Sequence, residues 1–279
     1  MKVEDGKKIL IKYYLEQLKK LKDTNFPTKD ISFIKIKFSH SFDCYNISKK
    51  ILESETFKNK SESFKNRVEI SCLLHDVGRF FELARELSGK PHGSFGAELL
   101  EKNKNITDKA VLLAIANHDK ESINLKDDKY YEILNDDDKK DSLEILKLLR
   151  DIDKIANLYL FKKNDDIYTR KDKKYGFSEE YFEALQNKHL IDKKYKNTIF
   201  DSIAYYIVWY HELEFESSKE FCRKYGLIQH LLNMFQKYIN IIEQDELNYY
   251  TMEEVKNKKN KMIECLIRIE QILKKQNII

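Results

Sequence analysis

A chain of 279 residues is long enough to bury a substantial hydrophobic core, and we expect it to form one main domain. Hydrophobic residues make up 42% and charged residues 35%, which is typical of a soluble globular protein with more charge than average. The net charge of +4 is nearly balanced, so it gives no strong signal for nucleic acid or an anionic membrane as a partner. Only 7 glycines and 2 prolines leave little turn chemistry for many short strands, which favours helices.

Cysteine usage and hydropathy bear on the cellular compartment. The four cysteines are widely spaced and form no Cys-x-x-Cys pair, which argues against a zinc knuckle or a disulfide framework. No charged-then-apolar leader precedes the first predicted helix, and no apolar run approaches the roughly 20 residues that a membrane span needs. We therefore expect a cytoplasmic protein without membrane contact.

The first half of the chain is predicted to be helical with one exception. Hydrophobic residues at three- and four-residue steps predict an amphipathic helix over residues 7–22, which Pro27 ends. Residues 31–38, ISFIKIKF, alternate as a strand would, and are the expected exception. Further helices are predicted over residues 40–55, 65–86 and 93–101, and from a cap at Thr107 or Asp108 to His118.

The second half is predicted to be helical between two charged loops. The charge run at residues 135–141 predicts a solvated loop, and residues 162–175 predict a second one. Ser142 opens a helix to about residue 161. Further helices are predicted over residues 178–188, 197–213, 217–240 and 251–275, the last with Thr251 and Glu254 in capping-box spacing. The predicted fold class is all-α.

Ionisable residues gather in the first half. Four of the seven histidines, His40, His75, His92 and His118, fall at the edges or in the interiors of predicted helices. His75 and Asp76 follow an apolar run in CLLHDVGRFFEL, and burying such neighbours is costly unless they are paired or bind a metal. On one helix they would lie about 100° apart, so a shared centre must sit in the angle between them. A metal ion inside a helical bundle is such a centre.

The order of these residues resembles a known family. His40, the His75–Asp76 pair in LLHDVGR and Asp153 in RDIDKI resemble the H…HD…D signature of the HD-domain superfamily of metal-dependent phosphohydrolases. The resemblance covers roughly residues 36–160 and implies an HD helical bundle there, with additional helices at about residues 176–279.

The resemblance also implies two divalent metal ions. His92 in HGSFGAELL and His118 in IANHDK resemble the added histidines of HD proteins that hold two metals. The ligands implied are His40, His75, Asp76 and Asp153 for the first metal, and Asp76, His92 and His118 for the second. Asp153 is preferred to Asp151 because the family pattern is D-x-D-K. Imidazole and carboxylate ligands suit Mn, Fe, Co, Ni, Zn or Mg, so the ligand set does not choose the metal.

Three basic residues are candidates for contact with an anionic substrate. Arg79, one turn beyond His75 on the predicted helix, is placed to hold a phosphate with its guanidinium group. Lys154 and Lys120 are further candidates for phosphate contact. The simpler interpretation makes Arg79 a surface salt-bridge residue and both lysines solvated ones.

Other residues also have simpler interpretations. His92 follows a Gly-Lys-Pro loop and can be an exposed loop histidine, whereas His118 ends a helix, where an imidazolium is favoured by the helix dipole. His189, His211 and His230 lie outside the resemblance and are expected to be structural or solvent-facing. The aromatic run in YYIVWYHELEF suits core packing better than a base-binding pocket.

Three functions follow from these patterns. The leading hypothesis is a metal-dependent phosphohydrolase in which metal-activated water, with Asp76, Arg79 and Lys154 as catalytic residues, attacks a nucleotide or another small phosphate ester. Phosphomonoesterase, phosphodiesterase and triphosphohydrolase activities stay open, as does the oligomeric state. The alternatives are an HD-type di-iron oxygenase and a non-enzymatic binding protein with a structural metal.

Overall fold

The structure is a computed structural model that describes residues 1–23, 28–82, 87, 89–163, 175–246 and 250–279. These residues form helices and connecting turns and no β-strand, so the all-α prediction is confirmed. The chain divides into two compact units, Met1–Ala156 and Asn157–Ile279. The expectation that they form a single domain stays a prediction. No described helix is long and apolar enough to cross a membrane.

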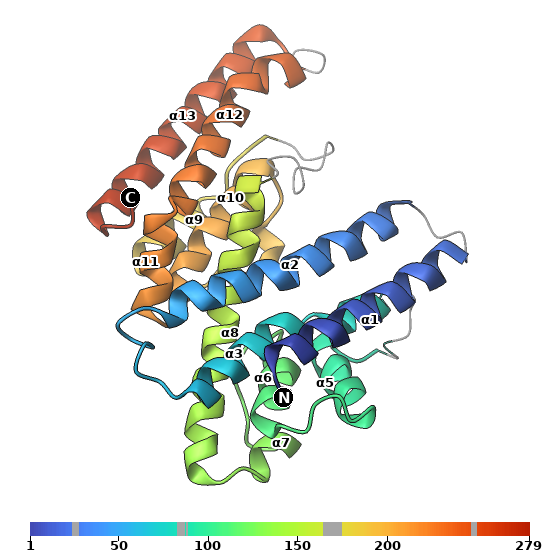
Figure 1. Cartoon of the computed structure of the whole chain (residues 1–279). Helices are drawn as coiled ribbons and strands as arrows, with labels where there is room; N and C mark the ends of the chain where they lie inside the picture. Colours follow the sequence, from blue (N-terminus) through green and yellow to red (C-terminus); the bar gives the residue numbers. More distant parts are fainter. Residues whose placement is uncertain (24–27, 83–86, 88, 164–174, 247–249) are drawn as a thin grey trace. The chain divides into compact units, whose positions relative to one another are not determined.

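The described residues of the first unit form eight helices, of which the last continues into the second unit. Helix α3 packs against α1, α2 and α6, and its residues 70–74 are buried. Figure 1 shows α1 and α2 side by side, and α5 packs against both α4 and α6. The helices are α1 (Val3–Asp23), α2 (Thr28–Leu52), α3 (Glu62–Leu74), α4 (Val77–Glu82), α5 (His92–Lys102), α6 (Lys109–Asn117), α7 (Lys129–Glu132) and α8 (Asp136–Lys163).

The second unit contains the C-terminal helices. Helices α12 and α13 lie side by side, and α10 packs against both α9 and α12 (Figure 1). Its elements are α9 (Glu180–Asn187), α10 (Ile199–Val208), α11 (Glu216–Lys224), α12 (Leu227–Glu246) and α13 (Met252–Lys275), with two short 3₁₀ helices, η1 (Lys193–Tyr195) and η2 (Trp209–Glu212). Tyr205, Tyr206 and Tyr210 of the aromatic run are buried, as core packing requires.

Helix α2 corrects the predicted strand-like segment. Residues 31–38 continue the helix to Leu52. The side chains that are buried along it, including Ile34, His40, Cys44 and Ile47, recur at helical rather than alternating spacing. Phe38 stacks on Tyr14 of α1 with ring centroids 4.0 Å apart. Tertiary packing on α1 therefore overrides the local β-propensity of the segment.

Two further boundaries differ from the predictions. The charge run is mostly the start of α8, where Asp136, Asp137 and Asp138 occupy the first turn and the Asn135 side chain accepts a hydrogen bond from the Asp138 amide at 2.9 Å. Aspartates there are favoured by the positive end of the helix dipole. The predicted helix over residues 217–240 breaks between α11 and α12 at Gly226, whose φ is +59°.

Several predicted features are present as expected, and others lie outside the described residues. Asp108 caps α6, and Thr251 and Glu254 form the predicted capping box of α13. Pro27, residues 83–86 of the predicted third helix, and residues 164–174 of the second charged loop are not among the residues that the structure describes.

Candidate metal centre

The His75–Asp76 pair lies at a break between two helices, and not within one helix as predicted. His75 is the C-cap residue of α3, and its amide donates to the Ser71 carbonyl at 2.9 Å. Helix α4 begins at Val77. Both side chains are buried. His75 Nε2 and Asp76 Oδ2 lie 3.5 Å apart, so both side chains face one centre. Because of the break, Arg79 lies on a separate helix from His75.

A first group of ligand atoms forms where α2, the α3–α4 break and α8 meet. His40 Nε2 lies 2.8 Å from Asp153 Oδ1. His75 Nε2 lies 3.7 Å from the same carboxylate oxygen and 3.5 Å from Asp76 Oδ2. Cys44 Sγ lies 3.6 Å from His40 Nε2, but burial raises the pKa of this thiol well above its ordinary value, so it stays protonated. Two imidazoles and two carboxylates thus converge there.

A second group faces the other oxygen of Asp76. His92, the first residue of α5, places Nε2 3.2 Å from Asp76 Oδ1. His118, which caps the C-terminus of α6, places Nε2 3.8 Å from that oxygen and 3.1 Å from His92 Nε2. All three side chains are buried. Asp76 therefore stands between the two groups, with one carboxylate oxygen turned to each.

Two of the imidazoles beside Asp76 are held from behind by backbone carbonyls, which aims their Nε2 atoms at the centre. His75 Nδ1 donates to the Cys72 carbonyl at 2.9 Å, and His118 Nδ1 donates to the Ile115 carbonyl at 2.8 Å. Because a carbonyl only accepts, each Nδ1 carries the proton and each Nε2 of the neutral ring keeps a lone pair. Among the residues that the structure describes, the buried His75 Nε2 finds no hydrogen-bond partner. A divalent cation would accept the lone pair of this nitrogen, so the residues fit a metal.

Electrostatics keep the two central carboxylates ionised. Burial alone raises the pKa of Asp76, but Lys37 and His75 outweigh it and hold the pKa well below its ordinary value. Burial likewise opposes ionisation of Asp153, and His40 and His75 overcome it to lower that pKa. Anionic carboxylates are the form that binds cations.

Two residues of this centre were not predicted. Asp119 Oδ2 lies 2.9 Å from His92 Nδ1 and accepts a hydrogen bond from the Gly93 amide at 3.1 Å. Burial lowers the pKa of His92, but Asp119 and then Asp76 raise it to about 9. The signal for Asp119 was its position directly after His118, which repeats the His-Asp pair at 75–76.

Lys37 is the second unpredicted residue. Its Nζ donates to Asp76 Oδ2 at 2.9 Å. Burial lowers the pKa of Lys37, but the carboxylates of Asp76 and Asp153 outweigh this effect and raise it. Lys37 belongs to the segment expected to be a strand, in which its side chain had no defined direction. On α2 it lies one turn before His40 and therefore on the same face.

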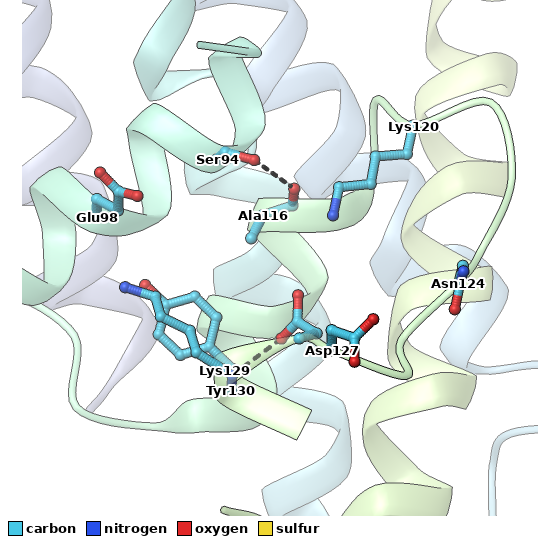
Figure 2. Close-up of a pocket in the computed structure, with 9 residues that line it drawn as sticks. Ser94, Glu98, Ala116, Lys120, Asn124, Asp127, Lys129 and Tyr130 are labelled. Atoms are coloured by element: carbon cyan, nitrogen blue, oxygen red, sulfur yellow. Dashed lines mark hydrogen bonds between the residues drawn. The ribbon is translucent and has the colours of Figure 1, made fainter. Parts of the chain in front are cut away.

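The predicted substrate contacts lie in different places. Arg79 Nε is 3.7 Å from Asp76 Oδ1, and its guanidinium also donates to Glu82 Oε2 at 2.6 Å. Lys154 is half-buried on α8, directly after Asp153. Lys120 donates to Asn117 Oδ1 at 2.5 Å and lines a pocket of about 460 Å³ between α5, α6 and α7 (Figure 2). Arg79 therefore contacts Asp76 at the edge of the His–Asp group.

The two aspartates of α8 lie in different surroundings. The Asp153 carboxylate contacts His40 and His75, and Asp151, two residues earlier, is fully buried. The preference for Asp153 as the ligand stays a prediction. The remaining predicted ligands, His40, His75, Asp76, His92 and His118, are brought into the same cluster.

Comparison with known proteins agrees with this arrangement. Residues 38–158 match the family model described as HD domain. Comparisons with curated proteins and with solved structures each give no match. The matched segment runs from two residues before His40 to five residues after Asp153 and so contains all six residues of the cluster. The sequence of residues 38–158 is therefore similar to that of an HD domain.

Proposed function

We propose that the protein is a metal-dependent phosphohydrolase acting on a nucleotide or another small phosphate ester. HD domains are found in metal-dependent phosphohydrolases. The observation that carries the proposal is the position of Asp76, whose Oδ2 lies 3.5 Å from His75 Nε2 and whose Oδ1 lies 3.2 Å from His92 Nε2. A carboxylate between two groups of imidazoles is suited to bridging a pair of cations.

The residues divide between two cation positions. His40, His75 and Asp153 with Asp76 would hold one divalent ion, and His92 and His118 with Asp76 would hold the other. When bound, such a pair supplies a water of lowered pKa and neutralises charge that develops on a phosphoryl oxygen. Asp119 fixes the ring of His92 through Nδ1 and so orients the second position.

Basic side chains beside the cluster suit an anionic substrate. Arg79 lies at its edge with its side chain 30% exposed, so it would hold a phosphate from the solvent side. Lys37 is directed at Asp76 from α2 and adds positive charge to the same space. Lys154 and Lys120 stay candidates for contacts farther along the substrate.

The test is metal content together with activity on the full chain. Elemental analysis should find close to two divalent ions, falling toward one in His92→Ala and His118→Ala. Phosphate release should be measured with a nucleoside monophosphate, a diester and a nucleoside triphosphate, each with Mn²⁺ or Co²⁺. His75→Ala and Asp76→Ala should abolish release, whereas His189→Ala, an exposed histidine outside the HD domain, should not change it.

The same assays separate the alternatives. Iron-dependent consumption of dioxygen without phosphate release would indicate the di-iron oxygenase. Bound metal with neither activity would indicate a structural metal in a binding protein. Full phosphate release in Asp76→Ala would refute the proposed centre, because that residue is the one shared by both cation positions.

A further inference from the structure

The second unit contains a pocket that has no part in the HD domain. It lies where the C-terminal ends of α9 and α13 meet η2 and α11, and its volume is about 520 Å³. Its polar lining includes Lys188, His211, Glu216, Lys219, Arg223 and Gln276. All of these residues belong to Asn157–Ile279. The pocket is therefore complete within one unit.

The charge of this pocket is positive. Three cationic side chains face it, against the single carboxylate of Glu216. That carboxylate already pairs with Arg223, whose guanidinium donates to Glu216 Oε1 at 2.5 Å and to the Tyr210 hydroxyl at 2.6 Å. Within the described part of the chain, the side-chain ammonium groups of Lys188 and Lys219 have neither an ion-pair nor a hydrogen-bond partner, although both backbone amides are hydrogen-bonded. Two ammonium groups are thus left without a counter-charge.

Two buried polar atoms of the lining also lack a partner among the described residues. His211 Nε2 and Gln276 Oε1 are both buried and make no hydrogen bond, although Gln276 Nε2 donates to the Leu185 carbonyl at 2.9 Å. Burial, with Lys188 and Lys219 nearby, lowers the pKa of His211 to about 4, so the ring is neutral at pH 7. A neutral ring can donate one hydrogen bond from Nε2 to an anion, and Gln276 Oε1 can accept one from a hydroxyl group.

We propose that this pocket binds the phosphate group of a small hydroxylated molecule. Lys188 and Lys219 match the two negative charges of a phosphate monoester. A ligand with a single carboxylate would neutralise only one of the two ammonium groups. His211 donates to a phosphate oxygen, and Gln276 accepts from a hydroxyl of the organic part. The volume exceeds what a bare phosphate ion fills, which leaves room for that part. The site is independent of the reaction proposed for the HD domain.

The experiment uses the one tryptophan of the chain as a local reporter. Trp209 lies in η2 together with Tyr210 and His211 of the lining. The full-length protein is titrated with glucose 6-phosphate and, separately, with inorganic phosphate, at ionic strength held constant with chloride. Binding is followed by Trp209 fluorescence and by calorimetry. The same titrations in His75→Ala remove a contribution from phosphate bound at the HD centre and should leave the Trp209 response in place.

Charge-neutralising variants decide the outcome. The double variant Lys188→Gln/Lys219→Gln should weaken binding about tenfold, since it removes two charge contacts to a dianion. Lys224→Gln, an exposed lysine of α11 that is not in the lining, should bind as the unchanged protein does. Circular dichroism checks that each variant is folded. Tighter binding of the sugar phosphate than of free phosphate supports the proposal. Tighter binding of free phosphate overturns the claim that the pocket also contacts the hydroxylated part of the ligand. Undetectable binding of both, or equal affinity in the double variant, overturns the site.

Discussion

Replacement of Gly78 by alanine tests whether close approach of α4 and α5 builds the metal centre. A Cβ at residue 78 would lie 2.0 Å from the His92 carbonyl oxygen, which is 1.4 Å short of the 3.4 Å at which ordinary contact begins. It would also lie 3.2 Å from the Gly96 amide nitrogen. The clash is with backbone atoms, so no side-chain rotation relieves it and the two helices must separate.

The expected cost of that separation is about 2–4 kcal/mol of unfolding free energy, from overpacking in a buried interface. Separation of the helices also moves His92 away from Asp76. In the unchanged protein His92 Nε2 lies 3.2 Å from Asp76 Oδ1. A displacement of about 1 Å at a reacting centre can cost about a hundredfold in rate. Gly78→Ala should therefore lose both stability and the metal held by His92 and His118.

The assay is urea unfolding followed by far-UV circular dichroism, with elemental analysis of the same samples. The matched control is Gly6→Ala in α1, where an added Cβ meets nothing nearer than 3.6 Å. That change should be neutral or stabilise the protein by about 0.5–1 kcal/mol, because alanine favours a helix interior over glycine. If Gly78→Ala unfolds at the same urea concentration as the unchanged protein and keeps its metal, the argument from close packing is wrong.

Two further predictions concern α5 and the residues that hold it. Asp119→Asn should weaken binding of the second cation by about 10- to 100-fold, because it removes the charged partner of His92 Nδ1 at 2.9 Å, while the exposed Asp127→Asn should leave metal affinity unchanged by calorimetry. Unchanged affinity in Asp119→Asn would show that His92 needs no such partner. Glu101 accepts hydrogen bonds from Lys109 at 2.6 Å and from Lys129 at 3.1 Å, and chiefly through Lys109 its pKa falls to about 2. Since the folded-state pKa is below the unfolded value of 4.5, this stabilisation is complete above pH 4.5 and is lost as the pH falls toward 2. Glu101→Gln should cost about 1 kcal/mol at pH 7, a small value because the ion pairs are partly exposed, and the deficit should shrink by pH 3 in urea unfolding. An equal deficit at both pH values would contradict the ionic origin of the effect.

Much of the helical content was predictable because helix periodicity and caps are local. Asp108 at the start of α6 and the Thr251–Glu254 capping box act over three residues of chain, so their patterns can be recognised without any tertiary information. The order of the histidines and aspartates likewise identified residues that share one cluster in the structure. These ionisable residues stand next to apolar runs, which is unusual enough to be recognised in the linear sequence.

What depended on packing between distant segments was not predictable in the same way. The segment at residues 31–38 has an alternating pattern, and its helical state follows from contacts such as Phe38 on Tyr14 of α1. The acidic start of α8 was mistaken for a loop, because the favourable helix dipole acts only after the helix exists.

The sequence therefore determined the helical class and the identity of the candidate ligands, whereas tertiary structure decided how they converge. The break between α3 and α4 at His75 and Asp76, the approach of α4 to α5 at Gly78, and the side-chain pairing of Asp119 with His92 each depend on the three-dimensional arrangement of the helices. The pocket around His211 is assembled from four elements between residues 188 and 278. Hydrophobic period and capping report on neighbours three or four residues away, but the direction of a buried side chain depends on which distant helix packs against it.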